Sequence, residues 1–328
     1  MSVYDVAVIG AGAAGSTAAF HLANAGHRVC VLEAVEGPRV KPCGGGMASS
    51  VQQWFPFDLS PAVDDVIRRV DFSWCLDDPV VAELPGEAPF WIVRRERLDR
   101  LLLEKALEAG ATLHCPCLGQ QVEREDGQWT IRGDSGKSLT TRAVVIADGS
   151  ASPWSGQFGL GPRDLHLAST LSVRLEGLGT LNPGVARFEF GLVHHGFACA
   201  FPLTEGINVG EGTFIGRTAM DAETVLSALL PDLGFPADAG LRQQAALRVW
   251  NGHSPLHRDG MVAVGDPQQD AGGDEVPETW QRVRVASVMV HCAEWHWLAP
   301  CGVPWRAVAC RGAVACRGVG RKSESVLW

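Results

Sequence analysis

The sequence is poor in tyrosine, in positive charge and in long apolar runs. Only one of its 328 residues is Tyr, and 37 acidic against 28 basic residues leave a net charge of −9. An acidic chain has no electrostatic footprint for a polyanion, so we expect no nucleic-acid partner. A membrane-spanning helix needs about 18 consecutive apolar residues. No such run occurs, which excludes this class.

Export and disulfide signals are also missing. The first residues lack the basic-then-apolar pattern of a signal peptide, and the ten cysteines include no Cys-x-x-Cys pair. We therefore interpret the cysteines as reduced thiols and expect a cytoplasmic protein. Apolar residues make up 46% and charged residues 20% of the chain, as in ordinary globular proteins. The length predicts two domains or one large α/β unit.

The N-terminal region carries the first motif. The apolar run at residues 3–9 predicts a buried parallel strand. Gly10-Ala-Gly12-Ala-Ala-Gly15 follows at once, then an Ala-rich helix over 16–24, and then a strand over 28–32. This strand–turn–helix–strand order is the context in which such a glycine pattern holds a dinucleotide, NAD or FAD. The alternative is a glycine-rich turn in an unrelated α/β protein.

Each position of this motif has a physical task. Gly10 permits the tight turn, Gly12 lets the backbone approach a pyrophosphate, and Gly15 lets the helix pack closely on the strand. The unpaired N–H groups at the helix start, where Ala14 lies, favour an anion. Glu33, at the end of the second strand, is placed to accept hydrogen bonds from an adenosine ribose.

A second glycine cluster follows at Lys41-Pro-Cys43-Gly44-Gly-Gly46. Exposed backbone N–H groups beside a lysine make this an anion-binding loop or a flexible surface loop. Together with the first motif, it resembles the geranylgeranyl reductase family of FAD-dependent oxidoreductases, within the para-hydroxybenzoate-hydroxylase-like flavoproteins. Four later segments match that family in order, at residues 93–99, 144–149, 197–212 and 262–266.

The resemblance implies a set of site residues. The expected FAD-binding residues are Gly10, Gly12, Ala14, Gly15, Glu33, Cys43, Gly44, Gly46, Arg95, Asp148, Gly149, Gly265 and Asp266. The expected substrate residues are Phe197, Cys199, Phe201, Pro202, Gly210 and Gly212. Cys43 is the single catalytic candidate. Each segment alone also fits an ordinary role: an amphipathic helix for 98–109, a turn at Asp148-Gly149, or a helix cap at Asp266.

The implied fold class is mixed α/β. It consists of a Rossmann-like FAD-binding domain, interleaved with an antiparallel-sheet substrate domain. The expected FAD-binding domain comprises residues 1–90, 91–165 and 245–270, and the substrate domain comprises 166–244. We expect an irregular stretch over 36–90, where prolines recur, and hairpin turns at Asp126-Gly127 and Ser135-Gly136. The sequence over residues 218–230 predicts a helix.

The sequence changes character after Asp266. No family pattern continues over 267–328, and the hexad Ala-Val-Ala-Cys-Arg-Gly occurs twice in succession, at 307–312 and 313–318. The simplest hypothesis is a shifted reading frame or other gene damage from about residue 267. The alternative is a metal site of His291, Cys292, His296 and Cys301, whose spacings fit no zinc pattern.

The implied function is reduction of C=C bonds in a prenyl chain. FAD carries the chemistry, NAD(P)H or another reductant supplies electrons, and the substrate is a small-molecule or lipid prenyl compound. Lipidic substrates imply peripheral membrane contact. Phe197 and Cys199 stand where the family has Tyr and Trp, so the substrate pocket differs in shape. The alternatives are a flavin-dependent hydroxylase of the same fold and a truncated, non-functional relative without FAD.

Overall fold

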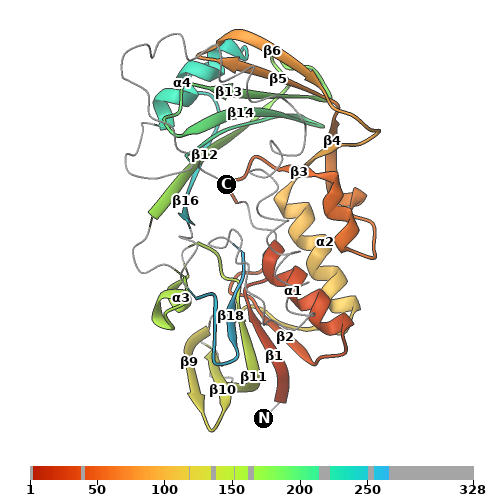
Figure 1. Ribbon diagram of the computed structural model, residues 1–328, viewed down its shortest axis with the longest axis vertical. Helices are drawn as coiled ribbons and strands as arrows, with labels where there is room; N and C mark the ends of the chain where they lie inside the picture. Colours follow the sequence, from red (N-terminus) through yellow and green to blue (C-terminus); the bar gives the residue numbers. More distant parts are fainter. Residues whose placement is uncertain are drawn as a thin grey trace, which may run out of the picture.

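The computed structural model describes residues 3–37, 41–117, 119–133, 138–150, 152–161, 166–213, 222–249 and 255–265. These residues form two halves, each built on a large sheet, with a small three-stranded sheet between them. Figure 1 shows β1, β2 and β11 at one end of the molecule and β5, β6, β13 and β14 at the other. The two long helices of the first half, α1 and α2, lie on one side of it, and the short α3 lies on the other.

The first half is an eight-stranded sheet with a parallel centre in the order β18-β11-β1-β2-β8. The β9–β10 hairpin extends it, and the predicted turn at Asp126-Gly127 joins those two strands with positive φ angles of 50° and 78°. The strands are β1 Val3–Ile9, β2 Val29–Leu32, β8 Thr112–His114, β9 Gly119–Glu125, β10 Gln128–Gly133, β11 Ser138–Ile146, β17 His257–Arg258 and β18 Met261–Ala263.

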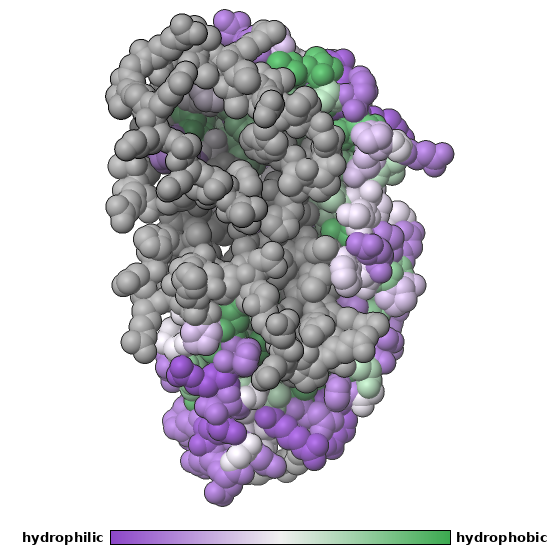
Figure 2. Space-filling model, in the orientation of Figure 1, coloured by the Kyte–Doolittle hydropathy of each residue, from purple (hydrophilic) through white to green (hydrophobic). Residues whose placement is uncertain are grey.

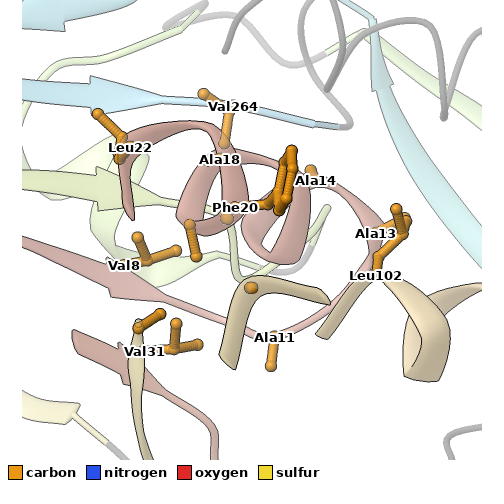
Figure 3. Close-up of a cluster of buried hydrophobic side chains, with 14 of the residues drawn as sticks. Val8, Ala11, Ala13, Ala14, Ala18, Phe20, Leu22, Val31, Leu102 and Val264 are labelled. Carbon is orange, nitrogen blue, oxygen red and sulfur yellow. The ribbon is translucent and has the colours of Figure 1, made fainter. Parts of the chain in front are cut away.

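Small side chains bring helix α1, Ala13–Asn24, close to this sheet. The helix begins three residues before the predicted start at Ser16, and Ala14 and Ala18 are buried. Figure 3 shows these alanines packed among Val8 of β1, Leu102 of α2 and Val264. The second helix of this layer, α2, spans Arg95–Glu108 and buries Leu98, Leu102 and Ala106. Helix α3, Pro153–Gln157, follows β11.

The second half is a seven-stranded sheet in the order β16-β12-β15-β14-β13-β5-β6. Its neighbours are antiparallel, as predicted for residues 170–213, except that β13 and β5 run parallel. The strands are β5 Arg69–Trp74, β6 Asp77–Glu83, β12 His166–Glu176, β13 Val185–Phe190, β14 Gly196–Leu203, β15 Gly206–Thr213 and β16 Arg242–Val249. A sheet with a parallel centre in the first half and a mainly antiparallel sheet in the second agree with the expected mixed α/β fold class.

The two faces of this sheet pack against different elements. The outer face, with Val209 and Ala200, packs against Leu226 and Leu230 of helix α4, Ala222–Asp232. The predicted helix at 218–230 thus corresponds to α4 as far as the described residues reach. The inner face carries the alternate residues of each strand, and on β14 it is apolar through Phe197, Cys199, Phe201 and Leu203.

The three-stranded sheet, in the order β3-β7-β4, fills the space behind this inner face. Its strands are β3 Gly46–Ala48, β4 Val63–Ile67 and β7 Phe90–Val93, and two short 3-10 helices, Ser49–Trp54 and Ser60–Ala62, lie between β3 and β4. Phe90 and Ile92 of β7 face the second sheet, whereas Trp91 and Val93 face α1 and α2.

The structure differs from the predicted domain boundaries in two places. Residues 69–83, expected in the FAD-binding domain, form β5 and β6 of the second sheet, and β16 carries that sheet on to Val249 rather than ending it at 244. The stretch 36–90 is not irregular as expected. Val70 and Phe72 alternate along β5 and join the inner apolar layer, which explains why these residues leave the first half.

The described surface is mostly hydrophilic over the first half. Figure 2 shows apolar residues at the opposite end, where β5 and β6 lie, and Trp74 and Val81 of these strands are 49% and 53% exposed. Among the described residues, no helix has the length and apolar content needed to cross a membrane.

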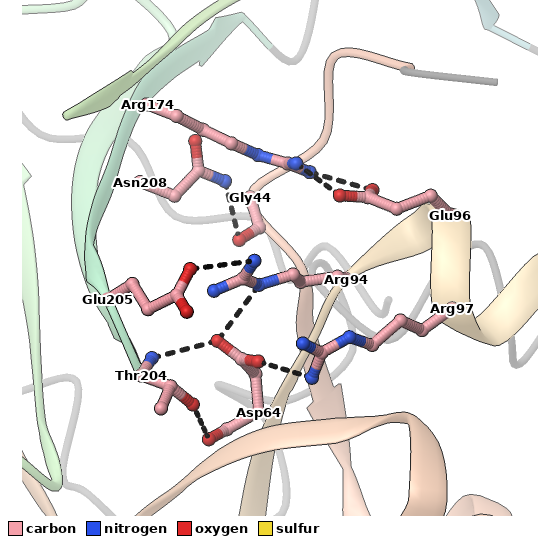
Figure 4. A network of polar contacts seen from close by, with 9 residues as sticks. All are labelled: Gly44, Asp64, Arg94, Glu96, Arg97, Arg174, Thr204, Glu205 and Asn208. Carbon is pink, nitrogen blue, oxygen red and sulfur yellow. Dashed lines mark hydrogen bonds and ion pairs between the residues drawn. The ribbon is translucent and has the colours of Figure 1, made fainter. Parts of the chain in front are cut away.

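A buried carboxylate joins the two halves (Figure 4). The side chain of Asp64, on β4, is 0% exposed and forms ion pairs with Arg94 at 3.1 Å and Arg97 at 2.9 Å, just before and within α2. It also accepts a hydrogen bond at 2.9 Å from the backbone N–H of Thr204, in the β14–β15 turn of the second sheet. One carboxylate therefore connects three chain segments: β4, the start of α2 and the β14–β15 turn.

We expect the substitution Asp64→Ala to lower the free energy of unfolding by about 3 kcal/mol, because it leaves the largely buried Arg94 with only the exposed Glu205 carboxylate, 3.8 Å away. Urea unfolding followed by circular dichroism measures the change. Asp77→Ala, at an exposed position of β6, is the matched control and should change stability by less than about 0.5 kcal/mol. Equal effects of the two substitutions would contradict the role given to Asp64.

Candidate functional site

The glycine turn after β1 is held by contacts that only glycine allows. Gly10 has a φ of +102°, and a Cβ on Gly15 would lie 1.9 Å from the carbonyl oxygen of Gly10. Helix α1 begins at Ala13, and its N-cap residue, Gly12, makes no side-chain hydrogen bond to the first turn. The turn and the helix start therefore offer donors and a positive dipole end to a pyrophosphate.

Glu33 lies at the end of β2, where the sequence analysis placed it. The residue is 5% exposed, and its carboxylate accepts hydrogen bonds from the backbone N–H groups of Ala11 at 2.7 Å and Val35 at 3.1 Å. A pocket of about 300 Å³ opens beside it, lined among others by Leu103 of α2 and Cys115. This pocket adjoins the first glycine turn at Ala11 and has the place that an adenosine would take, with Glu33 near its ribose.

The loop at Lys41–Gly46 is not simply a flexible surface loop. Gly45 has a φ of +86°, and a Cβ there would lie 2.3 Å from the Val93 carbonyl oxygen. A Cβ on Gly46 would lie 2.5 Å from the ring of Phe90 and 3.2 Å from that of Phe201. Glycine is therefore required because β7 and β14 pack directly against this loop.

Lys41 and the predicted Asp148-Gly149 motif come together. The Lys41 Nζ atom would lie 3.5 Å from a Cβ on Gly149, and a Cβ on Gly10 would lie 2.5 Å from the carbonyl oxygen of Ala147. The carboxyl end of β11 therefore lies against the first glycine turn and the start of the second glycine loop. Three predicted motifs, far apart in sequence, share one edge of the first sheet.

Arg95 is a buried cation rather than a solvated charge. Its side chain is 7% exposed and pairs with Asp99 of the same helix at 3.0 Å between Nε and Oδ1. Burial lowers the pKa of the guanidinium, but the Asp99 carboxylate and the hydrogen-bonded Cys43 side chain outweigh burial and raise it. A permanent positive charge thus lies next to the Cys43 thiol, an arrangement that favours the thiolate.

The predicted substrate residues divide between the two faces of the second sheet. Phe197, Cys199 and Phe201 lie on the inner face, and the register places Gly210 and Gly212 beside them on β15. Pro202 alternates to the outer face. Phe201 contacts the ring of Phe90 at 6.0 Å between centroids, so it packs on the glycine loop as well as lining the inner face.

The third flavin segment is described only in part. Gly265 follows β18 with a φ of +91°, and β18 pairs in parallel with β11. Asp266, residues 267–328 and the alternative metal ligands His291, Cys292, His296 and Cys301 lie outside the described residues. Within the described ranges no cluster of three metal-ligating side chains occurs.

Of the remaining cysteines of the first half, Cys115 lines the pocket beside Glu33. Cys115 donates from Sγ to the Val35 carbonyl at 3.4 Å, and Cys117 is buried. Burial raises the pKa of the neighbouring Cys30 thiol to about 12, so this group is protonated at neutral pH.

Sequence reasoning missed two polar residues of β15, Asn208 and Glu211. Asn208 is 3% exposed and donates from Nδ2 to the carbonyl oxygens of Cys43 at 2.6 Å and Gly44 at 2.9 Å. Glu211 is also 3% exposed but lies on the outer face, opposite Leu171 and Ala198. Burial raises its pKa to about 7, although a backbone hydrogen bond from Leu171 lowers it. A polar residue in an otherwise apolar or glycine-rich strand was the available signal.

The described residues fit the adenosine diphosphate part of FAD. The glycine turn, the helix start at Gly12 and Glu33 are placed where a pyrophosphate and a ribose would be contacted, and a pocket lies beside Glu33. The second glycine loop contacts both Arg95, through Cys43, and the inner face of the second sheet, through Asn208. These features are compatible with an FAD-binding chain.

Comparison with known proteins agrees with this geometry. The family model described as FAD dependent oxidoreductase matches residues 5–46. A digeranylgeranylglycerophospholipid reductase of Methanothermobacter thermautotrophicus is 30% identical over 305 residues, which cover 87% of this chain and 75% of the relative. An uncharacterised protein of Methanosarcina barkeri is 29% identical, and the chain spans 54% of its length.

Solved structures share the fold. A geranylgeranyl bacteriochlorophyll reductase-like protein from Thermoplasma acidophilum superposes with a TM-score of 0.72 at 20% identity, covering 96% of this chain and 83% of that chain. A halogenase solved with phloroglucinol and FAD superposes with a TM-score of 0.63 at 16% identity, covering 89% and 70%. At these identities the likeness concerns the fold alone.

We expect Gly15→Ala to weaken FAD binding at least tenfold, because the added methyl group forces α1 away from the Gly10 turn. Flavin fluorescence quenching during titration of the flavin-free protein measures the dissociation constant. Gly156→Ala is the matched control, since nothing lies within 4 Å of a Cβ at that position of α3. If Gly15→Ala binds FAD as the wild type does, the turn is not the pyrophosphate site.

Glu211 predicts a pH dependence of stability. Its pKa is raised in the folded protein, so the protonated form stabilises the fold. The free energy of unfolding should be highest below the ordinary carboxyl pKa of about 4.3 and fall as pH rises to about 7.

Glu211→Gln, which stays neutral, should remove this fall and unfold a few degrees above the wild type at pH 8 but not at pH 4. Thermal unfolding at both pH values measures the effect, with Glu83→Gln on exposed β6 as control. The same stability difference at both pH values would contradict the titration of Glu211.

Proposed function

The chain belongs to the geranylgeranyl reductase family of FAD-dependent oxidoreductases, and we propose that it reduces a C=C bond of a prenyl chain. Its relative at 30% identity is named for action on a digeranylgeranyl lipid. We extend that substrate class, a small-molecule or lipid prenyl compound, to this chain. NAD(P)H is the proposed electron donor, and a lipid substrate implies contact with a membrane surface.

A flavin bound here and reduced by the electron donor would provide the hydride for this reaction. The residues proposed to hold it are the turn at Gly10, Gly12 and Gly15, Glu33 for the ribose, and the Gly44–Gly46 loop for the ring end. The observation that supports the proposal best is the content of the inner face of the second sheet, directly beyond this loop.

That inner face is aromatic on β13 and β14, whereas on β15 and β12 it carries Asn208, which contacts the glycine loop, and Arg174, which pairs with Glu96. Phe188 contacts Phe197 at 5.5 Å and Phe201 at 5.4 Å between ring centroids, and Phe190 contacts Phe197 at 6.0 Å. Such a layer suits an isoprenoid chain and excludes water from it.

Reduction of a C=C bond needs a proton as well as a hydride. Cys43 is half-buried, lies on the flavin-facing loop and hydrogen-bonds Arg95. We assign it the role of proton donor, from Sγ to the second carbon, with the resulting thiolate stabilised by the Arg95 guanidinium. The proton is replaced from solvent before the next turnover.

A flavin-dependent monooxygenase is the second candidate, because halogenases share the fold. The two activities differ in their need for oxygen: hydrogenation consumes none, whereas hydroxylation consumes one O₂ per product. A flavin-free, inactive relative is the third, and it differs in having no flavin absorbance.

The experiment is an anaerobic assay of the FAD-loaded full chain with dithionite-reduced flavin and a digeranylgeranyl phospholipid in vesicles. We expect flavin absorbance between 350 and 500 nm that persists through gel filtration, and a product heavier by two hydrogens per reduced bond, measured by mass spectrometry. Cys43→Ser should lower kcat by about 100-fold while retaining FAD.

Cys75→Ser, at an exposed turn, is the matched control and should retain full activity. A product that forms only with oxygen would favour the monooxygenase. Protein that gains no flavin absorbance on addition of FAD would contradict both enzymatic functions.

A further inference from the structure

A single side chain of the second sheet holds the second glycine loop of the first half. The Nδ2 atom of Asn208, on β15, donates both of its hydrogens, one to the Cys43 carbonyl oxygen at 2.6 Å and one to the Gly44 carbonyl oxygen at 2.9 Å. Figure 4 shows the Asn208 side chain reaching across from the sheet to the loop at Gly44. The two residues it holds are separated from it by more than 160 positions in sequence.

The orientation of this amide is determined by its partners. Because both loop atoms are acceptors, only the nitrogen can face them. No donor among the described residues reaches the Oδ1 atom, which Figure 4 shows directed away from Gly44. A buried acceptor without a partner costs free energy. Asn208 therefore gives up a hydrogen bond at one end of its amide while holding the loop with the other.

The neighbours of Asn208 leave space for its side chain to contact the loop. Gly210 lies next to it on the inner face of β15, and Arg174, opposite Asn208 on β12, donates from Nη1 to Oε1 of Glu96 on α2 at 2.5 Å. Both side chains thus cross from the second sheet to the first half. Only that of Asn208 contacts the loop that carries Cys43.

The loop needs such a support from outside. Gly44, Gly45 and Gly46 have no side chains with which to pack, and glycine has the largest conformational freedom in an unfolded or loosened chain. Gly46 enters β3, and the carbonyl of Gly45 accepts the Val93 N–H at 2.8 Å. Cys43 and Gly44 precede these contacts, so their carbonyls are oriented by the Asn208 amide.

We propose that Asn208 is a positioning residue of the candidate site, whose side-chain amide fixes the Cys43 and Gly44 carbonyls and thereby holds the Cys43 thiol beside Arg95. The catalytic value of that placement rests on the proposed function. The placement itself is a property of the protein alone and is tested without cofactor or substrate.

The test uses the full chain with Asn208→Ala and Asn208→Asp. The aspartate has the size of asparagine but cannot donate to two carbonyls, so it separates loss of the donors from loss of packing. Ser172→Ala is the matched control: Ser172 is 4% exposed and faces the same side on the neighbouring strand, opposite Gly210. None of these measurements requires FAD.

The first readout is amide hydrogen exchange of the peptide that contains residues 41–46. We expect exchange about tenfold faster in both Asn208 variants than in the wild type and the Ser172→Ala protein, because each lost hydrogen bond held the loop closed. The peptide covering β1, residues 3–9, should exchange at the wild-type rate in all four proteins.

The second readout is the pH profile of Cys43 alkylation by iodoacetamide, followed by peptide mass spectrometry, with exposed Cys75 as internal reference. In the wild type we expect the midpoint below the ordinary thiol value of about 8.5. Asn208→Ala should raise it by about one pH unit, because the thiol is no longer held beside the guanidinium. A purely structural residue would not move this midpoint.

Wild-type exchange and an unchanged midpoint in both variants would overturn the proposal. Variants that do not fold would also overturn it, since a residue that only positions a loop is not required for folding. Failure of prenyl reduction with intact effects on exchange and alkylation would instead refute the proposed function and leave the role of Asn208 standing.

Discussion

The contact between the two halves depends on the ion pairs and the hydrogen bond that the Asp64 carboxylate forms. It is removed from solvent and holds two arginines that flank the start of α2, together with the turn between β14 and β15. A buried charge of this kind is tolerated only where its partners are all in place. These polar contacts act together with the apolar residues of β7, which pack on the second sheet from one face and on α1 and α2 from the other.

Close backbone approach is the second constraint. At Gly15 and Gly46 no side chain fits, because a carbonyl oxygen or an aromatic ring occupies the space. The first contact brings α1 against the turn that offers donors to a pyrophosphate, and the second brings β14 against the loop that carries Cys43. Both ends of the candidate site, at the first glycine turn and at the Cys43 loop, thus depend on close packing against glycine residues.

Local patterns predicted the first half well. The strand at 3–9, the helix that follows, the second strand and the acid at its end are consecutive, and each is recognisable from neighbouring residues. The hairpin at Asp126-Gly127 is likewise local. The domain boundary near residue 68 was missed because β5 pairs with β13, more than 100 residues later, and prolines nearby suggested irregular chain. No local signal reports which sheet a short strand joins.

By itself, the sequence determined the nucleotide-binding unit, the antiparallel character of residues 170–213 and the family, because glycine spacing and alternation are short-range properties. Only the tertiary structure decided which charged and polar groups are buried together. Arg95 meets Asp99 one helical turn away, but its approach to Cys43, and that of Asn208 to the Cys43 loop, depend on β7, α2 and β15 packing around one point. Such contacts join residues distant in sequence, and their energies arise only after folding has removed water from them.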